Sequence, residues 1–143
     1  MSRFAQKLTL PITILRVSIG IIYLWFGMLK FFPGVSPAED LAKETIQLLT
    51  FGLIKPDFSL VLLALWETVI GFLLISGLFV RVSMTLVVTH MICTFSPLLL
   101  LPQLSFTRLP YALTLVGQYI IKNIVIVSAL LVIYTSQRKE VVN

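Results

Sequence analysis

Three ionisable side chains stand in the middle of long apolar segments: a carboxylate at Glu67, an imidazole at His90 and an ammonium at Lys122. Counted along a helix at 1.5 Å per residue, each lies about 12–16 Å from the start of its segment. An isolated charge at that depth in a bilayer costs at least about 2.5–3.5 kcal/mol. We therefore expect the three side chains to face the interior of a helical bundle and to meet at about the same level.

Other polar or small residues share helical faces with these three. In the last apolar segment Thr114, Gln118 and Lys122 recur every four residues, and Asn123 and Tyr119 form a second stripe beside them. The corresponding faces elsewhere are Arg16, Gly20, Tyr23, Gly27 and Lys30 in the first segment, Glu67 and Gly71 in the second, and His90, Thr94 and Pro97 in the third. The glycines of the first segment would permit close helix contact.

These faces predict a polar pocket near the middle of the membrane. The residues expected to bind a ligand there are Glu67, His90, Gln118, Lys122, Asn123, Lys30, Tyr23 and Thr94. A second interpretation stays open, in which a Glu67–Lys122 pair only fixes which helices pack together, because a buried ion pair can act as a register device. The first interpretation leads, since ionisable residues inside the membrane are functional by default.

The residue types exclude several kinds of chemistry. Cys93 is the sole cysteine, so the chain has no dithiol pair for redox exchange. The single histidine cannot supply both axial ligands of a haem, and His90 with Glu67 lacks a third good ligand for a metal ion. We therefore predict no catalytic residue and no metal site, and we do not expect the chain to be an enzyme by itself. If the chain holds a cofactor, we expect it to be a quinone or a bound lipid.

Four apolar runs must position these residues, and each has about the 20 residues that a helix needs to cross a bilayer. They are residues 12–32, 58–79, 82–101 and 111–134. The chain of 143 residues is 58% hydrophobic and only 12% charged, with a mean hydropathy of +1.02, which is unlike a soluble domain. Because no run alternates like a barrel strand, we predict one all-α domain, an antiparallel four-helix membrane bundle.

The one sizeable loop, residues 33–58, contains the pattern of a short helix. Ser36, Pro37 and Glu39 fit a capping box with proline at the first helical position, and Gly52 suits the left-handed residue that ends a helix. Apolar and charged residues lie mostly on different faces of this helix. It is therefore expected to rest at the membrane interface or to cover the bundle, with a solvated linker as the alternative.

Basic residues in the loops predict the orientation. An even number of spans collects on one side Arg3, Lys7, Arg16, Arg81, Arg138 and Lys139. The other side has Lys30, Lys43, Lys55 and Arg108, offset by Glu39, Asp40, Glu44 and Asp57. The positive-inside rule then places both termini in the cytoplasm. The net charge of +5 is attributed to this topology, and no nucleic acid is expected as a partner.

Four stretches carry a resemblance to a known family: GIIYLWFGMLKFFPGVSPAE, LWETVIGFLLISGLFVR, HMICTFSPLLLLP and LVGQYIIKN. In their order they resemble the DoxX-like membrane proteins, in particular the branch that includes the inner-membrane protein linked to reactive chlorine resistance in bacteria. The resemblance implies a four-helix bundle of the bacterial plasma membrane and an association with quinone-linked redox metabolism. It carries over no catalytic residue.

Three functions remain open on this evidence. The first is a binding module for a quinone, a lipid or a small amphiphile, acting as an accessory in redox or oxidative-stress physiology. The second is a proton-coupled transporter subunit that uses Glu67 and His90 as a protonation switch. The third is a structural subunit of a larger membrane complex. Membrane lipid, other subunits of such a complex or further copies of the chain are the expected partners.

Overall fold

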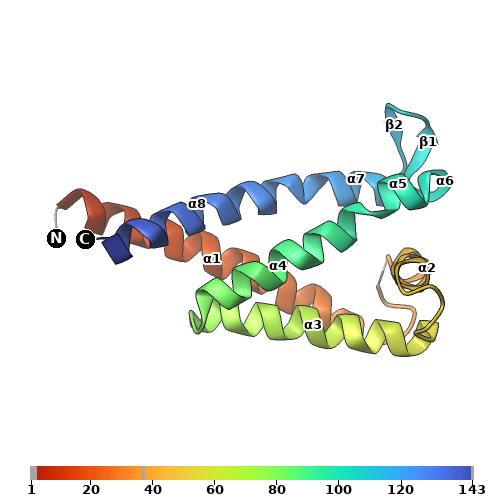
Figure 1. Cartoon of the computed structure of the whole chain (residues 1–143), viewed down its shortest axis with the longest axis horizontal. Coiled ribbons are helices and arrows are strands. Elements are labelled where there is room, and N and C mark those ends of the chain that lie inside the picture. The colour runs from red at the N-terminus through yellow and green to blue at the C-terminus, as the bar shows by residue number, and fades with distance from the viewer. Residues whose placement is uncertain (1–2, 37, 143) are drawn as a thin grey trace.

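The computed structural model describes residues 3–36 and 38–142, with side chains described between Leu10 and Gln137. Four of its helical segments are long and apolar enough to cross a membrane: Leu10–Leu29, Pro56–Ser76, Val80–Leu100 and Leu115–Gln137. Both ends of the chain lie at the same end of the bundle (Figure 1). The prediction of an all-α membrane bundle is confirmed.

The observed elements follow the predicted order, with two additions. They are α1 (Arg3–Leu29), α2 (Glu39–Leu49), α3 (Pro56–Ser76), α4 (Val80–Phe95), α5 (Pro97–Leu100), α6 (Pro102–Ser105), β1 (Phe106–Arg108), β2 (Ala112–Leu113), α7 (Leu115–Lys122) and α8 (Ile124–Val142). The additions are the short helix α6 and the antiparallel β1–β2 hairpin, and strand β2 occupies residues that the sequence had assigned to the start of the fourth span.

The hairpin delays the start of the fourth span to Leu115, four residues later than predicted. Thr114 marks this boundary because its hydroxyl accepts a hydrogen bond from the Gly117 amide at 3.1 Å. The same hydroxyl donates to the Leu104 carbonyl at 2.7 Å, which ties the helix start to α6. Thr114 is therefore a helix cap and not part of a polar stripe inside the bundle.

Two spans contain a single residue outside the regular helix, Ser96 between α4 and α5 and Asn123 between α7 and α8. Both residues keep right-handed helical backbone angles, so each span continues as one rod. Pro97 has no amide hydrogen for the Cys93 carbonyl, and the Ser96 hydroxyl donates to that carbonyl instead, at 2.7 Å. Such side-chain replacement is what a bilayer requires, because lipid offers the backbone no partner.

Glycines bring α1 and α3 together. A Cβ on Gly71 would lie 2.5 Å from the Leu24 amide nitrogen, and one on Gly27 would lie 2.8 Å from the Thr68 amide nitrogen. Only glycine permits this approach of the two backbones, as expected for small residues at a membrane helix interface. The predicted close contact along the Gly20–Gly27 stripe is confirmed.

Arg16 closes the same seam at the other end of α3. Its guanidinium donates to the carbonyl of Leu74 and, at 3.5 Å, to that of Ile75. These carbonyls belong to the last turn of α3, which ends at Gly77 with a left-handed φ of 76°. A guanidinium here satisfies carbonyls that no further helical turn can reach, and it complements the negative end of the helix dipole.

The short helix α2 lies at the end of the bundle away from the termini and packs on α3 and α5 (Figure 1). Its predicted capping box is wrong: Ala38 is the N-cap and makes no side-chain cap, and Glu39 instead accepts a hydrogen bond from the Gly34 amide at 2.7 Å. Pro37 lies outside the described residues. Gly52 is left-handed as predicted, with φ of 75°, but Phe51 precedes it in the same conformation.

The core fills the half of the bundle near the termini. Its fully enclosed members include Ile70 and Leu74 from α3, Val87 from α4 and Ile133 from α8. In the other half the spans diverge, and α1 separates from α7 while it stays packed on α3 and α8 (Figure 1). The divergence leaves room for a cavity beneath α2.

Candidate functional site

Glu67 is the centre of a buried polar cluster. It lies in the middle of α3 and is only 5% exposed. One carboxylate oxygen, Oε2, is 2.6 Å from Lys30 Nζ, and the other, Oε1, is 3.1 Å from His90 Nε2. A carboxylate buried among apolar side chains requires such partners, because removal from water without them costs several kcal/mol. The cluster therefore places both oxygens of Glu67 in charge-assisted contacts.

Tyr23 extends the cluster on the other side of the imidazole. Its hydroxyl is 3.0 Å from His90 Nδ1, and the two rings meet edge to face with centroids 5.3 Å apart. The Glu67 carboxylate can only accept, so Nε2 of His90 carries the proton. In a neutral imidazole Nδ1 is then the acceptor for the Tyr23 hydroxyl. Thr94 Oγ1 lies 3.5 Å from the same Nδ1 and donates to the His90 carbonyl at 2.9 Å.

The four members of this cluster come from different parts of the fold. Tyr23 lies on α1, Lys30 follows the end of α1, Glu67 is on α3 and His90 is in the second half of α4. The Lys30 ammonium also donates to the Phe26 carbonyl at 3.4 Å, so its long stem turns back toward the bundle interior. With a neutral imidazole, the positive charge of Lys30 balances the negative charge of Glu67.

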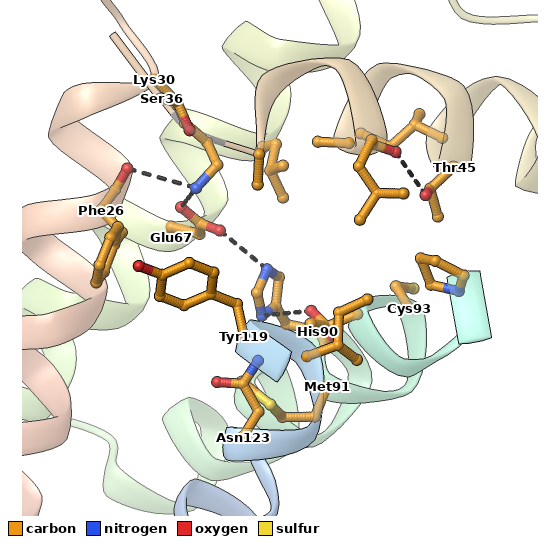
Figure 2. Close-up of a pocket in the computed structure, with 18 of the residues that line it drawn as sticks. Phe26, Lys30, Ser36, Thr45, Glu67, His90, Met91, Cys93, Tyr119 and Asn123 are labelled. Atoms are coloured by element: carbon orange, nitrogen blue, oxygen red, sulfur yellow. Dashed lines mark hydrogen bonds and ion pairs between the residues drawn. The ribbon is translucent and has the colours of Figure 1, made fainter. Parts of the chain in front are cut away.

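The cluster forms one wall of a cavity of about 300 Å³ beneath α2 (Figure 2). This volume is at the lower end of the range found for small-molecule sites. The polar residues on its walls are Tyr23, Lys30, Ser36, Thr45, Glu67, His90, Thr94, Tyr119 and Asn123. The other wall residues are almost all apolar and come from α1, α2, α3, α4, α5, α7 and α8. A few polar groups at the wall of an apolar cavity are typical of a site that orients a ligand with a polar head.

The predicted pairing of Glu67 with Lys122 is wrong. Lys122 is exposed, and its ammonium contacts the ring of Tyr119, 4.9 Å from the centroid. Because the fourth span starts at Leu115, Lys122 lies only about 10 Å into it. The partner of Glu67 is Lys30, which sequence reasoning had included in the pocket but had not paired.

Gln118 is also exposed and lies outside the cavity walls. The other predicted residues do line the cavity: Tyr23, Lys30, Glu67, His90, Thr94 and Asn123. The stripe of Thr114, Gln118 and Lys122 thus turns away from the cavity, and Asn123 from the neighbouring stripe turns toward it. Their spacing of four residues places Thr114, Gln118 and Lys122 on one helical face, but it does not show which way that face points.

Sequence reasoning missed the contribution of α2. Ser36 and Thr45 are buried at the cavity wall, and Leu41 and Ala42 of α2 lie beside them. The amphipathic pattern of α2 predicted a covering helix as one alternative, and its apolar face does cover the cavity. The amphipathic pattern shows that α2 has an apolar face, but it does not show which part of the protein that face packs against.

Comparisons with known proteins address the family of the chain. The family model DoxX matches residues 12–100, which is well over half of the chain and includes Lys30, Glu67 and His90. Neither the curated proteins nor the solved structures give a match. The matched segment runs from α1 through α5 and contains the helices that supply the buried cluster. The chain belongs to the DoxX family of membrane proteins.

Proposed function

We propose that the chain binds the head group of a membrane amphiphile, of the quinone class, in the cavity beneath α2. The observation that carries the proposal is the buried series Tyr23–His90–Glu67–Lys30, with contacts of 3.0, 3.1 and 2.6 Å, at the wall of an otherwise apolar cavity of about 300 Å³. Maintaining four polar groups there costs desolvation that a purely apolar core would avoid.

Asn123 supplies a donor that is suited to a carbonyl oxygen. It lines the cavity from the junction of α7 and α8, and its side chain makes no hydrogen bond to any other described residue. An amide group donates to a carbonyl as readily as a backbone amide does. Apolar side chains such as Met91 and Ile126 would hold the ring of the quinone against this donor.

The hydrogen-bonded series also offers a path for protons. A quinone takes up one proton for each electron when it is reduced to the quinol. An imidazole between a phenol and a carboxylate can pass a proton by accepting it at one ring nitrogen while it releases a proton from the other. We assign electron transfer to a separate redox partner. In this proposal the chain is an accessory binding module in redox or oxidative-stress physiology.

The cellular setting is part of the proposal. We infer a bacterial plasma membrane from the resemblance to the DoxX-like proteins, and we infer that both termini are in the cytoplasm because the basic residues gather on the side of the termini. The test replaces Asn143 by cysteine in a Cys93→Ser background and applies a membrane-impermeant thiol reagent to intact cells. Labelling only after the membrane is opened is expected, and labelling from the outside would reverse the orientation.

A second candidate function is proton-linked transport. It is favoured by the contact between His90 and Glu67, since protonation of either would change the charge of the cluster. Against it, both interrupted spans continue as single rods through Ser96 and Asn123, unlike the broken helices of many transporters. If vesicles that contain the chain bind a quinone but transport no solute across their membrane, the binding function is favoured over proton-linked transport.

The experiment that tests the proposal is mass spectrometry of the lipid extract of the purified full chain. We expect a quinone to be retained, and Asn123→Ala to lower its occupancy about fivefold, the loss of roughly one hydrogen bond. Ser128→Ala is the matched control, because Ser128 is an exposed residue of α8 that hydrogen-bonds only to Ile124. Wild-type protein that retains no quinone, even with quinone added during purification, would overturn the proposal.

A further inference from the structure

The cavity has an opening on the side where α1 and α7 diverge. Ile22 and Phe26 of α1 and Tyr119 of α7 line the cavity, and they are 42%, 44% and 49% exposed. The ring of Tyr119 extends from α7 toward the α1 side, where Phe26 lies (Figure 2). All three positions fall inside segments that can cross a membrane, so this opening faces acyl chains.

Two other sides of the cavity are packed by protein. Toward α3, the backbones of α1 and α3 are in contact at Gly27 and Gly71. Toward the termini, the enclosed core of the bundle fills the space. On these two sides the helices pack directly against one another.

Toward the loop end, α2 lies over the cavity and is held by polar contacts. Glu39 binds the Gly34 amide at 2.7 Å and the Lys43 ammonium at 2.9 Å, and Lys43 also lies 3.5 Å from Asp57 at the start of α3. A ligand arriving from water at this end would have to pass α2. A ligand arriving from the lipid between α1 and α7 would pass Ile22, Phe26 and Tyr119, with the Lys122 ammonium beside the Tyr119 ring.

The order of apolar and polar surfaces along this route indicates which kind of ligand fits. The rim is apolar and faces lipid, and the inner wall carries Tyr23, His90, Glu67 and Asn123. We propose that the ligand enters sideways from the bilayer, with its head against the inner wall and a long apolar tail left in the opening between α1 and α7. The inference rests on the proposed function and narrows it to long-tailed membrane amphiphiles, as opposed to water-soluble quinones.

The test uses two probes with the same head, a benzoquinone with a decyl tail and the same benzoquinone without a tail. Both are bound to the full chain in lipid nanodiscs, and empty nanodiscs correct for partition into lipid. Ile22→Trp narrows the opening, and Ile21→Trp is the matched control, because Ile21 is 52% exposed but is not on the cavity wall. Phe26→Trp narrows the same opening from the next turn, so the result does not depend on one variant folding.

We expect Ile22→Trp and Phe26→Trp to weaken binding of the tailed probe by at least about tenfold. Binding of the tailless probe should change by less than about twofold, and Ile21→Trp should affect neither. If both probes lose affinity equally, or if the tailed probe binds the narrowed variants normally, the lateral entry is refuted while the proposed function stands. If wild-type protein binds neither probe, it is the proposed function that fails.

Discussion

Lys30 and Glu67 form a buried ion pair, with Nζ 2.6 Å from Oε2, between the residue that follows α1 and the middle of α3. The two side chains are only 9% and 7% exposed. Replacing one partner of such a pair leaves a charge buried without compensation, which typically costs about 3–5 kcal/mol. The ion pair therefore adds a polar link between α1 and α3 to the glycine seam that already joins them.

Lys30→Met is expected to lower the free energy of unfolding in detergent by roughly 3–5 kcal/mol, because Glu67 loses its counter-charge. Lys122→Met should change it by less than about 0.5 kcal/mol, since Lys122 is exposed and does not contact the cluster. The double variant Lys30→Met with Glu67→Gln should recover most of the loss. Equal destabilisation by the two lysine variants would contradict the observed pairing.

Gly71→Ala is expected to destabilise the bundle by about 1–3 kcal/mol, the usual cost of overpacking. The added methyl would lie 2.5 Å from the Leu24 amide nitrogen and 2.8 Å from the Gly20 carbonyl oxygen, and neither backbone atom can move without separating α1 from α3. The control is Val69→Ala on the same helix, at a position that is 49% exposed. Thermal unfolding of both variants measures the difference, and a Gly71→Ala variant as stable as the control would disprove the tight seam.

The packing of α2 should weaken in acid. The hydrogen bond from Lys43 and then the one from the Gly34 amide hold the pKa of Glu39 below its ordinary value of 4.5. A carboxylate with a lowered pKa stabilises the folded state fully above its ordinary pKa, and this contribution is lost as the pH falls through the lowered value. The extra stability of docked α2 should therefore be present at neutral pH and be lost as the pH falls below 4.5 and through the lowered pKa of Glu39.

Hydrogen–deuterium exchange of the α2 amides, compared between wild-type protein and Glu39→Gln at each pH, measures this effect. The wild type should be better protected at neutral pH, and the difference should vanish in acid. Glu44→Gln on the same helix is the control, because Glu44 is exposed. A difference that persists unchanged in acid would show that the Glu39 carboxylate does not hold α2.

His90 is expected to carry a proton on Nε2, since the Glu67 carboxylate accepts from that nitrogen at 3.1 Å. As the sole histidine of the sequence, it gives one pair of imidazole resonances, Nδ1 and Nε2, in a ¹⁵N spectrum of protein purified without a histidine tag. Tyr23→Phe should shift the Nδ1 resonance, and Tyr134→Phe, at a position 51% exposed, should not. A proton found on Nδ1 alone would reverse the direction of the hydrogen-bonded series.

The sequence determined the number of spans, the short helix between the first two, and the depth of Glu67 and His90. These features depend on local quantities, namely the length of an apolar run and the rise per helical residue, which the sequence contains directly. The close approach of α1 to another helix could also be predicted from the sequence, because glycines at helical spacing leave part of one face without side chains.

The partner of Glu67 was decided only by the tertiary structure. Helical spacing shows which residues share a face of one helix, but the rotation of that helix about its axis depends on how all the helices pack. The β1–β2 hairpin moved the start of the fourth span to Leu115, and the packing of α7 leaves Lys122 on the outside. Lys30, beyond the end of α1, reached Glu67 because a long, flexible stem can carry an ammonium several ångströms from its own backbone.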